Sequence, residues 1–421
     1  MRALYTLLWW VALPLVLLRL WWRGRKEPGY RQHWAERLGR YGAATRSDRR
    51  TIWVHAVSVG ETRAAEPLID ALLAALPDAR IVLTHMTPTG RATGRSLFGR
   101  HGVRLVQAYL PYDLPHLVRR FVEHFAPSIC ILMETEVWPN LIAVCRAKQV
   151  PLALVNARLS ERSLRRGRRF GHLMTAAAEA ITVVAAQTED DAQRIRSLGA
   201  PLVGVTGSIK FDVAVPQAAL DTGAWLCARF GARKVLLCAS TREGEEALIL
   251  DAFQRIDRSE RPLLVIVPRH PQRFDEVEAM MRARGLTVAR RSTLGDGAVD
   301  VDAVLGDSMG EMFAYYVACD CAFIGGSLQP LGGQNLIEAC ALGKPVLIGA
   351  HTFNFAQVSD DAVAAGAALR VADADDLLRQ AQHLLSDGAA RERMGGQALA
   401  FANHHRGAAA RTLDLLRPYL K

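Results

Sequence analysis

The chain has 421 residues, of which half are hydrophobic, and its formal net charge is +10. This length exceeds that of one ordinary domain, so we expect two or three domains with sizeable cores. The sequence contains no short-period repeat and no low-complexity segment, which excludes repeat and fibrous proteins. The positive charge favours an anionic partner: nucleic acid, an anionic membrane surface or a phosphorylated substrate.

Seven cysteines are scattered along the chain, most of them within apolar runs. The closest pair, Cys319 and Cys321, lacks the second half that a zinc site requires. An odd, unpatterned number of cysteines indicates a reducing compartment.

The N-terminal segment is strongly apolar, because residues 3–18 carry no charge. As a helix they would cover roughly 24 Å, slightly less than the hydrocarbon core of a bilayer. Trp21 and Trp22 would lie at the headgroups, and a basic stretch follows. No small-residue cleavage site follows, so a signal peptide is excluded. We interpret residues 1–26 as an uncleaved membrane anchor with a basic flank, since a buried core helix would leave this flank unexplained. The positive charges after the segment place the rest of the chain in the cytoplasm.

After a polar, basic stretch, the first half alternates strands and helices. Short apolar runs predict strands at 52–56, 79–84, 103–109, 128–133, 152–156, 181–186 and 203–205. Helical spacing predicts helices at 61–73, 90–99, 114–124, 141–148 and 189–198. This alternation is typical of a parallel sheet covered on both faces by helices.

Glu61 stands at the start of the first of these helices, directly after a strand and a turn that contains Ser58 and Gly60. Ligands of parallel α/β sheets bind at the carboxyl ends of the strands. Glu61 is therefore a candidate functional carboxylate. It is equally explained as a charge that complements the helix dipole, and this stretch alone leaves both interpretations open.

Two further strand ends carry charged residues. Glu134 and Glu136 follow an apolar strand, which is costly unless they are paired or solvated. Lys210 follows a Gly-Ser turn at the last strand of this half. Between them lies an arginine-rich stretch comprising Arg158, Arg162, Arg165, Arg166, Arg168 and Arg169. It suits a polyanionic substrate better than a plain solvated helix face.

After a connector at 213–232, a second series of strands and helices begins. Strands are predicted at 234–239, 263–267, 301–305, 321–324 and 345–349, and helices fill 375–419. Residues 240–245 place a helix N-terminus at a strand end, which is a natural anion site. The glycines at 332–333 precede another helix and allow close approach to a phosphate, while Glu338 can reach a ribose. Two such halves predict a ligand cleft between domains, with a nucleotide in the second half and an anionic acceptor in the first.

The chain resembles the 3-deoxy-D-manno-octulosonic acid (Kdo) transferases of lipopolysaccharide synthesis over nearly its whole length. The motifs that carry this resemblance are His55–Glu61, Met86–Gly90, Tyr109–Pro115, Met133–Asn140, Asn156–Ser160, Gly207–Asp212, Val267–His270, Gly306–Glu311 and Gly332–Glu338. The resemblance implies the GT-B fold, with two Rossmann-like domains. It also implies inverting transfer of Kdo from CMP-Kdo to a lipid A precursor, lipid IVA.

The resemblance also implies roles for individual residues. Glu61 corresponds to the general base of the family, and Glu134 and Lys210 to residues that support the transition state. The CMP-binding set corresponds to Pro268, Arg269, Met309, Gly310, Glu311, Asn335, Leu336, Ile337 and Glu338. For the acceptor, the candidates are Ser58, Gly60, Arg158 and Arg162. We expect the helix N-terminus to keep Glu61 ionised at neutral pH.

These expectations define an organisation and a location. The domains are predicted at 27–212 for the acceptor and 233–400 for CMP-Kdo, joined by the linker 213–232, with a helix at 401–421 packing back on the first domain. The expected partners are CMP-Kdo, the lipid A precursor and anionic lipids of the inner membrane, with the catalytic domains on the cytoplasmic side. No cofactor, metal or nucleic acid is expected.

Two alternative functions stay open at this point. One is a nucleotide-sugar epimerase on the same fold, although its soluble substrate would need no membrane anchor. The other is a membrane-tethered nucleic-acid-binding protein, although the arginine-rich stretch has few aromatic residues interleaved.

Overall fold

The computed structural model describes residues 1–42, 49–169, 171–212 and 215–420. The side chains of Arg168 and Arg169, part of the arginine-rich stretch, lie outside the described residues. The chain forms two compact units, unit 1 (Met1–Asp212 with Arg406–Lys421) and unit 2 (Val213–His405). Each unit is described by itself below.

Unit 1 is built on a parallel sheet with the strand order β3-β2-β1-β4-β5-β6-β7. The strands are β1 (Thr51–His55), β2 (Arg80–His85), β3 (Leu105–Tyr109), β4 (Ile129–Met133), β5 (Leu152–Ala157), β6 (Val183–Ala186) and β7 (Val203–Val205). The helices are α1 (Arg2–Arg23), α2 (Trp34–Arg37), α3 (Val59–Ala75), α4 (Pro88–Phe98), α5 (Pro115–Phe125), α6 (Pro139–Ala147), α7 (Glu161–Arg169), α8 (His172–Glu179), α9 (Glu189–Arg196) and α18 (Ala408–Leu416). Short 3-10 turns lie at Pro28–Arg31, Gly99–Arg104, Ile209–Phe211 and Arg417–Tyr419.

Apolar strands account for this arrangement. Every residue of β1, β2, β4 and β5 is buried, as expected for strands covered by helices on both faces. Two apolar clusters result: Ile52 and Val54 of β1 pack in one, and Trp53 packs in the other. The alternation of side chains along a strand thus places successive residues of β1 in different layers.

The N-terminal helix α1 lies against unit 1 along its length. Its first turns bond to the body of the unit, since the Tyr5 hydroxyl donates to Asp113 at 2.9 Å. Its last turns place Leu20 in an apolar cluster with Tyr112 and Leu114. The remaining face is exposed and apolar, and consists of Leu4, Leu7, Leu8, Trp10, Val11, Leu15, Leu18, Trp21 and Trp22. With a mean hydropathy of 1.8 over its best window, α1 is long and apolar enough to cross a membrane.

Unit 2 repeats the parallel design with the strand order β10-β11-β9-β8-β12-β13-β14. The strands are β8 (Val235–Thr241), β9 (Leu263–Pro268), β10 (Val288–Arg290), β11 (Ala303–Leu305), β12 (Cys321–Ile324), β13 (Val346–Ile348) and β14 (Ala368–Arg370). The helices are α10 (Gln217–Phe230), α11 (Glu245–Phe253), α12 (Phe274–Ala283), α13 (Met312–Ala318), α14 (Ile337–Ala341), α15 (Ala356–Ala364), α16 (Ala374–Ser386) and α17 (Gly388–His405). Short 3-10 turns lie at Arg258–Glu260, Pro271–Arg273 and Arg291–Thr293. The edge strands β10 and β14 were not predicted from the sequence, because each has only two apolar residues before an arginine, whereas the predicted β11 and β13 are apolar throughout.

The structure differs from the predicted linker at 213–232. Helix α10 occupies most of this stretch and packs closely on α13, because a Cβ atom on Gly223 would come within 2.5 Å of the Val317 side chain. Residues 215–232 are therefore part of unit 2 rather than a connector, and residues 213–214 lie outside the described residues.

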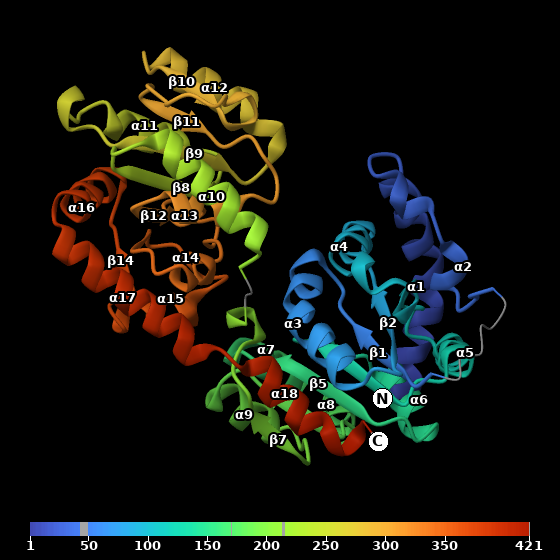
Figure 1. Cartoon of the computed structure of the whole chain (residues 1–421). Helices are drawn as coiled ribbons and strands as arrows, with labels where there is room; N and C mark the ends of the chain where they lie inside the picture. Colours follow the sequence, from blue (N-terminus) through green and yellow to red (C-terminus); the bar gives the residue numbers. More distant parts are fainter. Residues whose placement is uncertain (43–48, 170, 213–214, 421) are drawn as a thin grey trace. The chain divides into compact units, whose positions relative to one another are not determined.

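The predicted single helix at 401–421 is two helices in the structure, α17 and α18, which belong to different units. Helix α17 continues to His405 within unit 2, and the chain enters unit 1 at Arg406. Helix α18 packs on α3 (Figure 1), where Arg411 donates to the Thr206 carbonyl at 2.9 Å. The final segment thus completes the core of unit 1.

Both sheets reverse their strand order beside their first strand. In unit 1 the chain runs from β1 to β2 on one side and returns to β4 on the other, and in unit 2 β8 lies between β9 and β12 in the same way (Figure 1). The carboxyl ends of strands at such a reversal form the usual ligand crevice of open α/β sheets. Functional side chains are therefore expected after β1 and β4, and after β8 and β12.

Candidate active site

Glu61 lies in the first turn of α3, directly after β1 in unit 1. Its Oε2 accepts the backbone N–H of Val57 at 2.7 Å, and its Oε1 accepts the Ser58 hydroxyl at 3.1 Å. Ser58 is the residue that precedes the helix, so this turn and its carboxylate hold each other in place. Gly60 is exposed beside them, and the nearest atom to a Cβ there would be 4.0 Å away.

The protonation of Glu61 differs from the expectation. Burial raises the pKa of Glu61 to about 7, and the charges of Glu136 and Glu134 act in the same direction. The hydrogen bonds from Val57 and Ser58 oppose this rise without cancelling it. The helix N-terminus therefore does not keep the carboxyl fully ionised at neutral pH, because desolvation outweighs the amide dipoles. A carboxylate with a pKa near the working pH is a better general base than an ordinary one.

Glu134 lies at the end of β4 and is the best-paired carboxylate of the site. Its Oε1 is 2.9 Å from the Lys210 ammonium, and its Oε2 is 3.9 Å from Arg158. Its φ of 55° is unusual for a residue other than glycine. The structure thus brings together Glu134 and Lys210, which are far apart in the sequence.

Glu136 belongs to the same cluster but has a different set of neighbours. Its Oε2 accepts the Trp138 indole N–H at 2.8 Å and lies 4.0 Å from Nε2 of the fully buried His55. Burial raises the pKa of Glu136, and the charge of Glu134 adds to this. Burial also lowers the pKa of His55 to about 3, so this imidazole is neutral at physiological pH.

Asn156, at the end of β5, positions the lysine of the site. It is fully buried, has a φ of 52°, and accepts the N–H of Ile209 at 3.1 Å through its Oδ1. Ile209 begins the 3-10 turn that carries Lys210. Sequence reasoning assigned no role to Asn156, because its partner lies 53 residues further along the chain.

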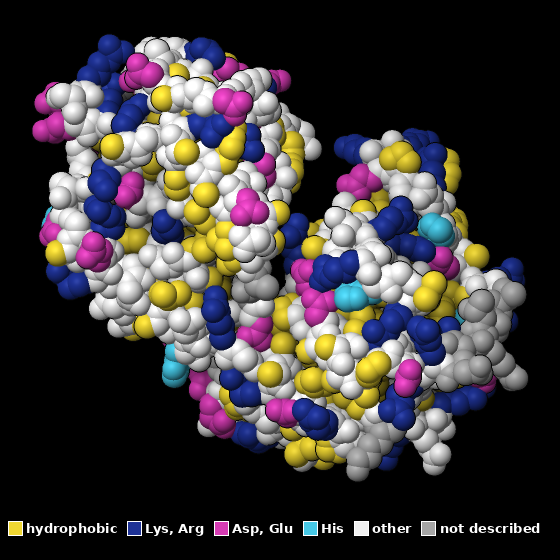
Figure 2. All heavy atoms as spheres, in the orientation of Figure 1, with side chains coloured by type: hydrophobic (Ala, Val, Ile, Leu, Met, Phe, Trp, Pro, Cys, Tyr) yellow, Lys and Arg dark blue, Asp and Glu magenta, His cyan; other side chains and the backbone are white. Residues whose placement is uncertain are grey.

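The predicted acceptor arginines are accessible. Arg158 is half exposed and faces Glu134, Arg162 is exposed on α7, and Arg165 is 3.8 Å from Glu161. On the face of the molecule shown in Figure 2, Lys and Arg side chains are scattered among acidic ones rather than gathered into one stripe. The basic side chains on that face therefore do not form the continuous stripe that is typical of a nucleic-acid-binding surface.

The predicted CMP-binding residues lie at the carboxyl ends of strands in the sheet of unit 2. Pro268 ends β9 and is followed by the exposed Arg269, whose N–H donates to the Thr241 carbonyl at 2.9 Å. The segment 309–311 follows β11, and the segment 335–338 follows β12. Because β11, β9, β8 and β12 are successive neighbours in a parallel sheet, their carboxyl ends lie on the same side of the sheet.

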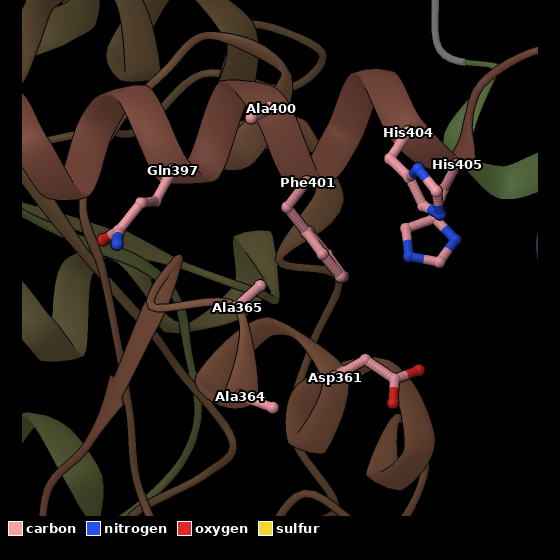
Figure 3. A pocket seen from close by; sticks show the side chains of 8 residues that line it. All are labelled: Asp361, Ala364, Ala365, Gln397, Ala400, Phe401, His404 and His405. Atoms are coloured by element: carbon pink, nitrogen blue, oxygen red, sulfur yellow. The ribbon is translucent and has the colours of Figure 1, made fainter.

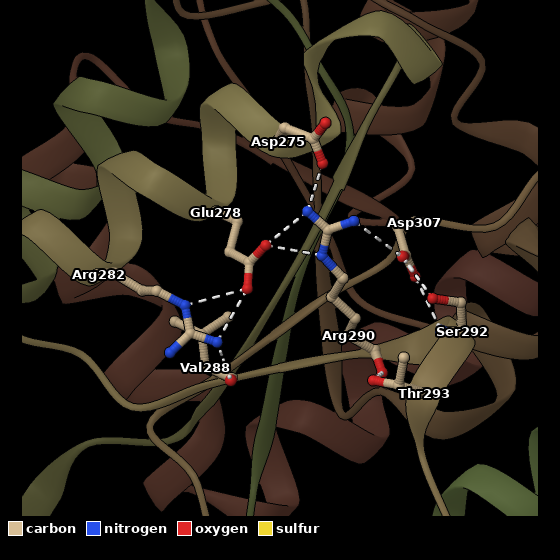
Figure 4. Close-up of polar contacts among 8 residues, drawn as sticks. All are labelled: Asp275, Glu278, Arg282, Val288, Arg290, Ser292, Thr293 and Asp307. Carbon is tan, nitrogen blue, oxygen red and sulfur yellow. Dashed lines mark hydrogen bonds and ion pairs between the residues drawn. The ribbon is translucent and has the colours of Figure 1, made fainter.

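A network of polar side chains contacts Asp307, which precedes the segment 309–311. Asp307 accepts the Ser292 N–H at 2.8 Å and is 3.8 Å from Arg290, which also contacts Asp275 and Glu278 (Figure 4). Beyond Asp307, the exposed Met309 precedes Gly310, whose φ is 84°.

The last residue of that loop, Glu311, is already engaged. It accepts the Ser308 hydroxyl at 2.6 Å and an Arg291 N–H at 3.0 Å. Glu311 thus closes the loop that is predicted to contact CMP.

The second loop is closed by its own side chains. The Asn335 Oδ1 accepts the N–H of Ile337 at 3.1 Å, and its Nδ2 donates to Glu338 at 3.2 Å. Leu336 and Ile337 are buried, so their side chains are not available to contact a ligand. Gly332 and Gly333 have φ values of 95° and 76°, a backbone conformation that favours glycine.

The turn at 240–245 differs from the anion site that was expected there. The carboxylate of Glu245 itself accepts the N–H of Arg242 at 2.9 Å, so an anion of the chain takes this amide. A separate hollow in unit 2, lined by Asp361, Ala364, Ala365, Gln397, Ala400, Phe401, His404 and His405 (Figure 3), contains none of the predicted site residues. Among the residues that the structure describes, no group of three or more His, Cys, Asp or Glu could hold a metal ion.

Comparison with known proteins shows which family the chain belongs to. A family model described as 3-deoxy-D-manno-octulosonic-acid transferase (kdotransferase) matches residues 32–213, and one described as glycosyl transferases group 1 matches residues 247–400. The chain is similar to the 3-deoxy-D-manno-octulosonic acid transferase of Bordetella pertussis, with 48% identity over 100% of this chain and 99% of that protein. It is 38% identical to the enzyme of the same name from Haemophilus influenzae, over 100% of this chain and 99% of that one.

A solved structure shares the fold at low identity. UDP-GlcNAc 2-epimerase from Neisseria meningitidis superposes with a TM-score of 0.60 and 15% identity, over 87% of this chain and 100% of that chain. The two parallel α/β units, together with the match to the glycosyl transferases group 1 model, show a glycosyltransferase of the GT-B type. Within that class, the chain belongs to the 3-deoxy-D-manno-octulosonic acid (Kdo) transferase family. Kdo transfer is therefore its activity, and the epimerase alternative is not supported.

Proposed function

We propose that the chain transfers Kdo from CMP-Kdo to the lipid A precursor lipid IVA, with inversion and with Glu61 as the general base. The observation that carries this proposal is the Glu61 carboxyl in the first turn of α3, which is held by Val57 and whose pKa burial raises to about 7. Such a group accepts a proton readily and is still substantially ionised at neutral pH.

The proposed reaction is a single displacement. The acceptor hydroxyl oxygen forms a bond to the anomeric carbon of Kdo while the bond from that carbon to the CMP phosphate breaks. CMP leaves with the electron pair, and the hydroxyl proton passes to Glu61. One displacement inverts the configuration at the anomeric carbon.

Glu134 and Lys210 support the transition state in this proposal. The reacting sugar gains oxocarbenium character, which a carboxylate such as Glu134 stabilises. The donor's own carboxylate needs a cation, and Lys210 is the candidate because it is partly exposed and stays 2.9 Å from Glu134. The pair therefore offers both charges that the sugar requires.

Unit 2 binds the donor in this proposal. Arg269 is exposed at the end of β9, where its guanidinium can stabilise the phosphate charge that develops as CMP leaves. The segments at 309–311 and 335–338 follow β11 and β12 at the carboxyl side of the same sheet, and Gly310, Gly332 and Gly333 give their loops tight turns. These properties suit a cytidine monophosphate group.

We propose further that α1 attaches the protein to the inner membrane, with the catalytic units on the cytoplasmic side. The exposed apolar face of α1 suits lipid, and the Arg25 guanidinium lies over the Trp21 ring at 4.7 Å, near the end of the helix. Basic residues there favour anionic lipids. The accessible Arg158 and Arg162 would meet the phosphates of the acceptor, and nucleic acid is not expected as a ligand.

Reconstitution tests the proposed acceptor and donor directly. The full chain in detergent is incubated with CMP-Kdo and lipid IVA, and the mass of the lipid product is measured. A mass increase of one or more Kdo units is expected, with release of CMP. An unchanged lipid mass with active family enzyme as the positive control would contradict the proposed acceptor. We also propose metal-independent transfer, so loss of activity on adding a chelator would contradict that part alone.

A further inference from the structure

Glu245, the first residue of α11, is a fully buried carboxylate without a cationic partner among the contacts of the described residues. Its oxygens accept four backbone N–H groups, from Arg242 (2.9 Å), Gly326 (2.6 Å), Ser327 (2.9 Å) and Leu328 (2.9 Å). Arg242 follows β8, and the other three residues follow β12. The side chain therefore joins the two strand ends between which the ligand crevice of unit 2 is expected.

The neighbouring Glu246 shows how different this arrangement is. Glu246 is equally buried, but its Oε1 is paired with the Arg273 guanidinium at 2.7 Å. A buried carboxylate is stable when it is paired or fully hydrogen-bonded, and Glu245 uses only the second route. The carboxylate of Glu245 is therefore stabilised by the backbone of the two loops that it joins.

The loop held by Glu245 leads directly to the predicted CMP-binding segment. The Gly326 carbonyl accepts the N–H of Gly333 at 2.6 Å, and Gly333 stands two residues before Asn335. Gly325 lies so close to the β8 end that a Cβ atom would be 2.6 Å from the Ser240 carbonyl oxygen. The turn after β12 can adopt this position only while it remains against the turn after β8.

We propose that Glu245 is a positioning residue for the donor: it clamps the turn at 326–328 against the turn at 242 and thereby shapes the CMP pocket. This inference rests on the proposed binding of the donor by unit 2. The carboxylate does not touch the donor, since all four of its bonds go to backbone of its own unit.

The test compares Glu245→Gln with Glu246→Gln in the full-length protein. The amide of Gln cannot accept with its nitrogen, so Glu245→Gln leaves buried N–H groups of the clamp unpaired. Glu246→Gln also removes a buried charge, but it weakens a contact to Arg273 and leaves the clamp intact. Isothermal titration with CMP, well below the melting temperature, is expected to give a Kd raised about tenfold or more for Glu245→Gln. The Kd for Glu246→Gln is expected to stay within about twofold of the wild type.

Amide hydrogen exchange supplies the readout that general destabilisation would not reproduce. The peptide covering 325–333 is expected to exchange faster in Glu245→Gln, while β8 and β9 remain protected. An unchanged CMP affinity, or equal losses in both variants, overturns the inference while leaving the proposed function intact. Failure of the wild type to bind CMP overturns the proposed donor and the inference together. If Glu245→Gln does not fold, Glu245→Asp keeps the charge but shortens the reach, and wild-type affinity in that variant would also overturn the inference.

Discussion

Glu61 and Glu245 occupy corresponding places in the two units. Each lies in the first turn of the helix that follows the first strand of its sheet, beside the point where the strand order reverses. Glu245 is fully buried and accepts four backbone N–H groups. Glu61 is partly exposed, and the contacts described for it are one N–H group and one hydroxyl.

The loop after the neighbouring strand accounts for the difference. After β12 the chain presents three N–H groups, which satisfy the carboxylate of Glu245. After β4 the chain presents Glu134 and Glu136, whose charges help to raise the pKa of Glu61. The same residue type at the same place in the fold is thus a backbone clamp in one unit and a candidate base in the other.

The largest expected effect is the loss of transfer in Glu61→Gln. The variant is expected to lower the rate roughly 10²-fold or more, because it removes the group that takes the acceptor proton. CMP affinity should be unchanged, since the base lies in unit 1. Product mass in a single-turnover experiment measures the rate, and titration measures CMP binding. Glu66→Gln, which changes a partly exposed carboxylate of the same helix that pairs with Arg100, is the matched control. A near wild-type rate in Glu61→Gln would exclude the base assignment.

A smaller loss is expected for Lys210→Met. This change leaves Glu134 without its cation at 2.9 Å and removes the candidate partner of the donor carboxylate. The rate is expected to fall roughly 10-fold to 100-fold. Lys148→Met, which removes an exposed lysine paired with Glu123, serves as the control. Steady-state rates with both variants, at saturating CMP-Kdo, make the comparison. Equal rates in the two variants would show that Lys210 has no special role.

Several parts of this site could be predicted from the sequence. Apolar runs followed by turns placed Glu61, Glu134 and Lys210 at strand ends, because parallel strands are buried on both faces and their boundaries are easy to recognise. The motif resemblance then assigned them to one site.

Other parts depended on contacts between distant segments. The bonds of Glu245 reach across 81 to 83 residues, which no local pattern records. The pKa of Glu61 depends on burial and on neighbouring carboxylates, so the helix dipole alone gave the wrong expectation. The stretch 213–232 was assigned as a linker, although tertiary packing of α10 on α13 makes it part of unit 2.

The stability of Glu61→Gln should move in the opposite direction to that of Glu245→Gln. The folded pKa of Glu61, about 7, exceeds its ordinary value of 4.5, so the folded state favours the protonated form. The stabilising contribution of the Glu61 carboxyl to the free energy of unfolding is fully present below about pH 4.5 and is lost as the pH rises through 7. At pH 8, Glu61→Gln is therefore expected to be more stable than the wild type by about 1–3 kcal/mol, and close to it at pH 4.

Denaturant unfolding of the full chain at both pH values measures this difference. Glu245→Gln, which leaves buried N–H groups unpaired, should instead be less stable at both values. A wild type that is more stable than Glu61→Gln at pH 8 would mean that the carboxylate is well satisfied, as Glu245 is.

The smallest expected effect is a shift of the acid limb of the rate profile in Glu136→Gln. Burial is the largest cause of the raised pKa of Glu61, and the charge of Glu136 adds to it, so removing that charge should lower the pKa only partway toward its ordinary value. In the wild type the rate should rise with pH through an apparent pKa near 7. The acid limb of Glu136→Gln should lie at lower pH. At pH 6 this variant should therefore retain a larger fraction of its own high-pH rate than the wild type does, by a few-fold. Glu123→Gln, an exposed carboxylate on α5, should leave the limb in place. An unmoved limb in Glu136→Gln would mean that the charge of Glu136 has no part in raising the pKa of Glu61.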